Sequence, residues 1–186
     1  PVKPIELGDP HVERFSLNAL CLLAAGATLA ACHPPSAVDL ANSTYQGIES
    51  TPVTLVDGLW EGQPYVEGAA SRPRVGLADT LDLRGDLDGD GHEETVVLLW
   101  HSTGGSGTFD YLAVMARRNG KSENIATAPV GDRVKIRDAR LFGAVIELDV
   151  TQQGPGDAAC CPTQQVTRRW SLLNGELEEL GEEQAR

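Results

Sequence analysis

Three aspartates stand at alternate positions in one acidic segment, Asp86-Leu87-Asp88-Gly89-Asp90-Gly91-His92-Glu93-Glu94. Side chains spaced in this way on a tight loop can converge on one cation, and glycine permits the sharp turn that the loop requires. Calcium takes six to eight oxygen ligands from carboxylates and carbonyl groups. The expected ligands are Asp86, Asp88, Asp90, the backbone carbonyl of His92, and Glu94. The segment therefore predicts a structural calcium (Ca2+) site.

The acidic segment is not an EF-hand, because the bidentate glutamate of that motif would fall at Val97, inside an expected strand. It is similar instead to the calcium loops of integrin-type propeller repeats, whose pattern is DxDxDGxxD. Glu94 replaces the final aspartate of that pattern, and the resemblance covers only Asp86–Glu94. The alternative is an acidic turn without a metal, in which the neighbouring carboxylates would repel one another.

An uncharged apolar run begins at Phe15, directly after Arg14, and closes with Leu29-Ala30-Ala31-Cys32. A basic residue, a short apolar run and small residues before a cut are the parts of a secretory signal peptide. A membrane-spanning helix is less well supported, because it needs about 20 mostly apolar residues and this run contains Ser16 and Asn18.

The tetrapeptide that ends at Cys32 resembles the lipobox of bacterial lipoprotein signal peptides. The resemblance implies cleavage before Cys32 and attachment of lipid to its sulfur and new amino group. The folded part would then lie in the cell envelope, outside the cytoplasm and anchored to a membrane. His33 follows the cysteine, where an aspartate would retain an enterobacterial lipoprotein at the inner membrane, so the outer membrane is expected in a Gram-negative host.

The expected organisation has four parts. Residues 1–31 are a signal peptide, 32–45 a lipidated tether, 46–180 a β domain and 181–186 a charged tail. Residues 1–11 fit a signal peptide poorly because they are rich in proline and acidic residues, which suggests that translation begins at Val12.

The chain is acidic, with a formal net charge of −12. Binding to nucleic acid depends on lysine and arginine at the phosphates, so this function class is excluded. A cluster of basic residues that would hold the chain to an anionic membrane surface is absent from the sequence as well. The expected membrane contact is therefore the lipid anchor alone.

Short apolar and alternating runs from residue 46 onward predict strands. Val96–Trp100 and Tyr111–Ala116 are continuously apolar, which is typical of central strands that are buried on both faces. Asp57-Gly58, Asn119-Gly120 and Asn174-Gly175 are hairpin turn pairs. The pattern predicts an all-β domain, built as a single antiparallel sheet, a sandwich or an open barrel.

A glycine-rich segment joins the two central strands and contains Thr103, Gly104, Gly105, Ser106 and Gly107. It is not a phosphate-binding P-loop, because no lysine follows the glycines. One interpretation is a flexible connection. The other is a ligand loop whose backbone amides receive a small anion or a glycan.

Cys160 and Cys161 are adjacent, and they are the only cysteines left if Cys21 leaves with the signal and Cys32 carries lipid. An exported protein meets an oxidising environment in which disulfides persist. The pair can form a vicinal disulfide, bond between molecules or stay reduced. A zinc site with His92 or His101 is a weaker alternative, because adjacent cysteines lack the usual ligand spacing.

The order of the acidic loop, two apolar strands, an Ala-Cys-Cys-Pro-Thr loop and a final Arg-Trp strand resembles small bacterial lipoproteins, some of them of mycobacterial type. The resemblance covers about Gly85–Gly175. It implies fold and location but no chemistry, because the members compared in this way have no assigned activity.

Two classes of function follow from these patterns. The first is a non-enzymatic, calcium-stabilised envelope lipoprotein with a binding or accessory role toward an envelope protein or a glycan. The alternative is an envelope hydrolase that uses a carboxylate pair or His101, the one histidine outside the expected tether and metal loop of the exported part.

Overall fold

The computed structural model describes residues 34–158 and 160–181. The chain divides into two units, residues 1–30 and 31–186, and the described residues all belong to the second. The expected signal peptide (1–31), the start at Val12 and the lipidated Cys32 lie outside the described residues. So does nearly all of the expected charged tail.

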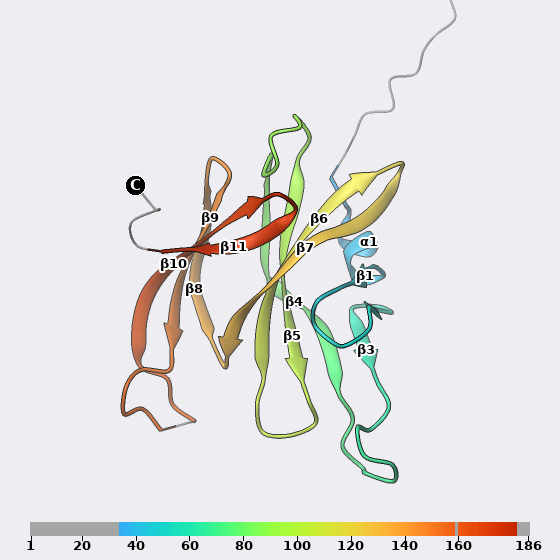
Figure 1. Cartoon of the computed structure of the whole chain (residues 1–186), viewed down its shortest axis with the longest axis vertical. Coiled ribbons are helices and arrows are strands. Elements are labelled where there is room, and N and C mark those ends of the chain that lie inside the picture. Colours follow the sequence, from blue (N-terminus) through green and yellow to red (C-terminus); the bar gives the residue numbers. More distant parts are fainter. Residues whose placement is uncertain (1–33, 159, 182–186) are drawn as a thin grey trace, which may run out of the picture. The chain divides into compact units, whose positions relative to one another are not determined.

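Nine of the strands form two antiparallel sheets, so the prediction of an all-β, antiparallel fold is confirmed (Figure 1). In each sheet, strands that follow one another in the sequence are hydrogen-bonded neighbours. The five-stranded sheet contains β3 (Leu59–Glu61), β4 (Arg74–Gly85), β5 (Glu94–Ser102), β6 (Phe109–Arg118) and β7 (Lys121–Asp132). The four-stranded sheet contains β8 (Lys135–Phe142), β9 (Val145–Gln152), β10 (Gln164–Leu173) and β11 (Glu176–Leu180).

The three predicted turn pairs all adopt the left-handed backbone of tight turns. Asn119 and Gly120, with φ of 53° and 77°, join β6 to β7, and Asn174 and Gly175, with φ of 53° and 82°, join β10 to β11. Two successive positive φ angles fit the twist of a two-residue hairpin loop. Asp57-Gly58 also turns, but its flanks meet in only a single bridge between Val56 and Leu59.

The larger hydrophobic core lies between the two sheets. Leu98 and Leu112 of the five-stranded sheet pack in one cluster with Leu148 and Trp170 of the four-stranded sheet. These four side chains are at most 4% exposed. The two sheets therefore form a sandwich, because each covers the apolar face of the other.

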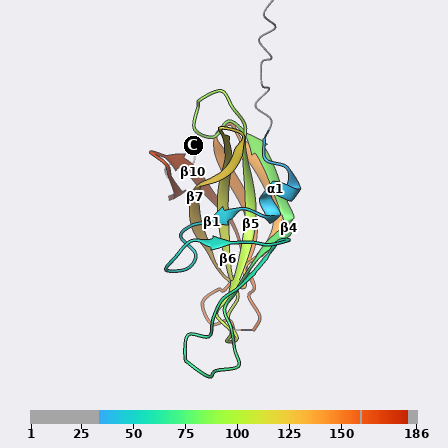
Figure 2. The ribbon, with the colours of Figure 1, turned by 90° about the vertical axis from the view of Figure 1, so that its right-hand side faces the viewer.

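A second core covers the opposite face of the five-stranded sheet, the face that is turned toward the viewer in Figure 2. The covering segment contains the short helix α1 (Ala37–Ala41) and a two-stranded sheet of β1 (Thr44–Tyr45) and β2 (Val53–Thr54). Its buried residues pack on Val97, Leu99, Ala113 and Met115. The prediction that the apolar runs of β5 and β6 are central strands buried on both faces is confirmed.

The expected tether ends too late at residue 45. Leu40 is 4% exposed and Tyr45 is fully buried, and the Tyr45 hydroxyl donates to the Leu40 carbonyl at 2.8 Å. Ser36 and Asp39 form a capping box at the start of α1, which satisfies free backbone donors of the helix. The folded part therefore begins by α1, because this segment buries apolar side chains that a tether would leave in water.

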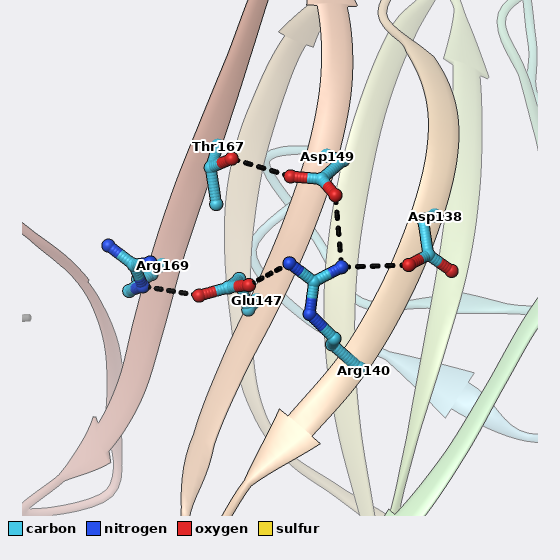
Figure 3. Close-up of polar contacts among 6 residues, drawn as sticks. All are labelled: Asp138, Arg140, Glu147, Asp149, Thr167 and Arg169. Carbon is cyan, nitrogen blue, oxygen red and sulfur yellow. Dashed lines mark hydrogen bonds and ion pairs between the residues drawn. The ribbon is translucent and has the colours of Figure 1, made fainter.

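A polar network covers the outer face of the four-stranded sheet (Figure 3). Arg140 contacts Glu147 and lies 2.9 Å from Asp149 and 2.7 Å from Asp138. Glu147 also pairs with Arg169 at 2.5 Å. Glu147 is only 3% exposed, because the two guanidinium groups cover it. A carboxylate on the outer face of the sheet is in this way both buried and paired.

Candidate functional site

The acidic loop connects β4 to β5, and its two ends are fixed by the sheet. Gly85, the last residue of β4, pairs with Glu94, the first residue of β5. Asp86 follows Gly85 directly, so Asp86 and Glu94 lie next to each other at the base of the loop. The sheet register thus brings together the first and last of the predicted ligands.

Three carboxylates converge in this loop: Asp86, Asp88 and Glu94 offer ligand oxygens that all lie within 4.8 Å of one another. Two oxygens that each lie about 2.4 Å from one calcium ion can be at most about 4.8 Å apart. The cluster therefore fits around a single cation, and its all-oxygen ligand set suits a hard ion.

Backbone amides hold the loop in this shape. Asp86 accepts from the N–H of Gly89 at 2.7 Å and from that of Gly91 at 3.1 Å. Both glycines have positive φ, of 80° and 87°, which other residues adopt at a cost. Asp88 accepts from the N–H of Asp90 at 3.1 Å. These bonds place the carboxylates before any ion arrives.

Glu94 is the buried member of the cluster, at 2% exposure. Burial raises the pKa of its carboxyl group, the Leu87 N–H that donates to it at 2.9 Å lowers the pKa, and the charges of Asp88 and Asp90 raise it further. Burial and the neighbouring negative charges thus disfavour the ionised form. A bound cation would reverse this effect, since it favours the ionised carboxylate.

The structure brings three of the five predicted ligands together. Asp86, Asp88 and Glu94 form the cluster, whereas the Asp90 carboxylate accepts from the N–H of His92 at 2.8 Å. The cluster also has a positive neighbour, because Arg118 of β6 lies 3.8 Å from Asp88. Arg118 was not anticipated from the sequence, since only the fold brings it to the loop.

His101 lies far from the acidic loop, near the other end of β5, and has an acidic partner that the sequence did not reveal. Its Nε2 lies 2.8 Å from Oε1 of Glu49, which also accepts from the Tyr65 hydroxyl at 2.5 Å. The two atoms are not aligned for a hydrogen bond, so the contact is an ion pair only when His101 is protonated. His101 is 5% exposed, because the covering segment lies over it.

Asp110 of β6 and nearby Asp132 are two carboxylates that bear on the alternative of a hydrolase with a carboxylate pair. Asp110 is 8% exposed, and burial raises its pKa to about 6, while the Val134 N–H that it accepts at 3.1 Å acts in the opposite direction. The charge of nearby Asp132 raises the pKa further. Asp132 itself is paired with Arg133 and accepts from the N–H of Thr108.

The glycine-rich segment joins β5 to β6, as predicted, and touches a part of the chain distant in sequence. A Cβ added to Gly104 would lie 2.9 Å from the Ser71 Cβ and 3.1 Å from the Arg72 carbonyl oxygen. Gly104 also has a φ of 84°. Glycine is therefore required at this position for two reasons: the positive φ of the turn and the close approach to the β3–β4 connection.

The cysteine loop joins β9 to β10 and is organised around Asp157. The Asp157 carboxylate accepts from the N–H of Gly154 at 2.8 Å, and from the N–H and the hydroxyl of Thr163 at 2.7 and 2.8 Å. These bonds lower the pKa of Asp157. The sulfur atoms of Cys160 and Cys161 are in close contact, and both residues are exposed.

Among the described residues, no helix has the length and apolar character needed to cross a membrane. Comparison of the chain with protein-family models, with curated proteins and with solved structures finds no match. The function is accordingly inferred from the sequence motifs and from the geometry of the loops.

Proposed function

We propose that the protein is an exported, lipid-anchored and calcium-stabilised β domain of the cell envelope, with a binding or accessory role rather than an enzymatic one. The observation that carries the calcium part is the convergence of Asp86, Asp88 and the buried Glu94 within 4.8 Å. The anchor part rests on the lipobox that ends at Cys32 and on the resemblance to small bacterial lipoproteins.

Calcium would act as a structural clamp at the β4–β5 connection. Glu94 belongs to the last residue pair between these strands, and Asp86 directly follows its partner Gly85, so one ion bound to both carboxylates would fix the two strands to each other. Calcium sites of extracellular modules have dissociation constants of about 0.1–1 mM. At a calcium concentration tenfold above the dissociation constant, mass action adds about 1.4 kcal/mol to the free energy of unfolding.

The anchor would hold the folded domain close to the membrane. α1 begins at Ala37, so four residues lie between it and Cys32 and five Cα–Cα steps join the two positions. A fully extended chain spans at most about 3.6 Å per residue, which limits this separation to about 18 Å. A short link of this kind suits a domain that works at the membrane surface.

The experiment that tests the proposal is mass spectrometry of the protein from the membrane fraction of a bacterial host that processes lipoproteins, grown with labelled palmitate. We expect a chain that begins at Cys32 and carries fatty acids. After proteolytic digestion, all of the label should remain on the N-terminal peptide that contains Cys32. The variant Cys32→Ser should lose the label, whereas the matched variant Cys21→Ser, altered within the same apolar run, should keep it. An unprocessed wild-type chain without fatty acid would contradict the proposal.

The partner in this role would be an envelope protein or a glycan. A polar groove of about 550 Å³ adjoins the acidic loop and is lined in part by Gln46, Asp88, Arg118 and Asn174. Amide and charged groups of this kind hydrogen-bond sugar hydroxyls and polar protein surfaces. Capture on immobilised envelope glycans and on envelope proteins, with calcium present and absent, would distinguish the two partner classes.

A second candidate function is an envelope hydrolase, and the observation that favours it is the Glu49 partner of His101. An acid beside a histidine is a common arrangement for a general base. At 5% exposure, however, His101 would reach a substrate only if the covering segment moved. A hydrolase screen of the wild type against His101→Ala tests this alternative, which requires an activity that the variant loses.

A further inference from the structure

The β3–β4 and β5–β6 connections lie at the end of the domain opposite the acidic loop (Figures 1 and 2). Residues of these two connections and of the adjoining strand ends line a polar pocket. Its volume is about 250 Å³. Apart from Ala70, its lining consists of two arginines, two serines and two glycines: Arg72, Arg74, Ser71, Ser102, Gly104 and Gly105. The glycine-rich segment thus forms one wall, and a segment some thirty residues earlier in the sequence forms the other.

The two arginines of this pocket share one carboxylate. Arg74 pairs with Glu61 at 2.7 Å, and the Arg72 Nε lies 3.7 Å from the same carboxylate. Two guanidinium charges against one carboxylate leave an excess of one positive charge. This excess stands out in a chain whose formal net charge is −12.

The guanidinium groups are held in place but remain accessible. Arg72 also donates weakly to the Gly62 carbonyl at 3.4 Å and to Gln63 at 3.3 Å. The side chains of Arg72 and Arg74 are still 42% and 56% exposed. A guanidinium carries five N–H donors, so these contacts leave donors for a ligand.

The glycine-rich segment lies close against the opposite wall of the pocket. At Gly104 the approach is so close that an added Cβ would lie 2.9 Å from the Ser71 Cβ and 3.1 Å from the Arg72 carbonyl oxygen. Gly105 beside it is open, because a Cβ there would meet only the Thr103 hydroxyl, at 3.8 Å. The pocket therefore has one glycine that closes it and one that leaves room in it.

From these observations we infer that the pocket binds a small oxyanion, a phosphate or sulfate group, through Arg72 and Arg74. Paired guanidinium donors match the geometry of tetrahedral oxyanions, and charge-assisted hydrogen bonds of this type are about twice as strong as neutral ones. The Ser71 and Ser102 hydroxyls supply further donors at the rim. Glu61 holds the two arginines together between binding events. The site is independent of the lipid anchor and of the acidic loop.

Isothermal titration calorimetry tests the inference on the full chain in a non-ionic detergent, with inorganic phosphate, glucose 6-phosphate and glucose as probes. We expect both phosphates to bind and glucose not to bind. Arg72→Gln and Arg74→Gln should each weaken phosphate binding about tenfold or more. The control Arg137→Gln makes the same change of charge at an exposed position of β8, in the other sheet, and should bind like the wild type.

The glycines provide a second, charge-neutral test. Gly104→Ala should abolish phosphate binding, whereas Gly105→Ala keeps the wall in place and should change the affinity by less than the arginine variants do. Thermal unfolding of each variant reports whether it is folded. Tighter binding of the sugar phosphate than of inorganic phosphate would show that the group is recognised on a larger carrier, and equal binding would show that the free ion suffices.

The inference is overturned if inorganic phosphate and glucose 6-phosphate both fail to bind, or if Arg137→Gln weakens binding as much as the pocket variants do. Neither result would bear on lipidation at Cys32 or on calcium binding, which have their own measurements. Failure of those measurements would equally leave the phosphate titration intact.

Discussion

The substitution Glu94→Gln separates the calcium clamp from the rest of the fold. Glu94 is buried and its pKa is raised, so in the metal-free protein its ionised form lowers the stability. The sign follows from linkage: stability from a carboxyl group with a raised folded-state pKa is present below the unfolded-state pKa and is lost as the pH rises through the folded-state pKa. At pH 7 without calcium, Glu94→Gln should therefore unfold at the same temperature as the wild type or at a higher one.

Calcium should reverse this order. At tenfold saturation the wild type gains about 1.4 kcal/mol, which for a domain of this size corresponds to a rise in melting temperature of about 3–6 °C. Glu94→Gln removes one of the three converging carboxylates and should lose most of that rise. The neighbouring Glu93→Gln makes the same change of charge at an exposed position and should keep the full rise.

Thermal unfolding followed by circular dichroism, in EDTA and in a calcium series, measures both effects in one experiment. Magnesium at the same concentrations controls for the general effect of a divalent ion on an acidic chain. The reasoning is refuted if calcium leaves the wild-type melting temperature unchanged, if Glu94→Gln responds like the wild type, or if Glu93→Gln loses the response.

Three further predictions follow from other parts of the fold. Cys160 and Cys161 should resist alkylation in the native protein until a reductant is added; alkylation of both without reductant would show free thiols. Asp110→Asn should raise the free energy of unfolding at pH 8 by at most about 3 kcal/mol. The reason is that burial raises the pKa of the Asp110 carboxyl group from 3.8 to about 6, and the stability from such a group is lost as the pH rises through that value. In urea unfolding the gain should vanish at pH 3.5, and a gain independent of pH would contradict the explanation. Glu147→Gln should lower the free energy of unfolding by about 1–3 kcal/mol, which is less than the loss on breaking a fully buried pair because its two arginines are partly exposed. The control Glu178→Gln, at an exposed position, should lower it little. Equal effects of the two variants in urea unfolding would rule out a special role for the network.

Local patterns predicted much of the fold. The turn pairs and the apolar runs of β5 and β6 are local signals, and each was found from the sequence. β4 was missed because its pairing with β5 shifts between Ala78 and Asp82, which breaks the alternation of buried and exposed residues. β7 was signalled only by the Asn119-Gly120 turn before it, since its register shifts twice against β6 and it contains Pro129.

In the candidate sites, too, the residues that are close in sequence were predicted, whereas those brought together by tertiary packing were not. Asp86, Asp88 and Glu94 lie in one short segment, so their spacing predicted that they would converge. Glu49 meets His101, and Arg72 meets the glycine-rich segment, only because the covering segment and the β3–β4 connection fold onto β5 and β6. Such contacts are set by tertiary packing, and residue spacing along the chain carries no signal for them.

The covering segment explains why the expected tether extended too far. Residues 34–45 are rich in proline, serine and alanine, which is typical of a linker. Leu40 and Tyr45 nevertheless find a ready-made apolar surface on the second face of the five-stranded sheet. Ile48, Val53 and Leu55, which follow in the same segment, are buried in the same cluster. A composition typical of a linker does not reveal that individual apolar side chains are buried in this way.

The most direct test of the central claim is a crystal structure of the protein grown in calcium, with anomalous diffraction used to locate the ion. The account predicts one calcium ion in the β4–β5 loop, at about 2.3–2.6 Å from oxygens of Asp86, Asp88 and Glu94. A map at saturating calcium with no anomalous peak in this loop, and with the three carboxylates turned away from one another, would contradict it.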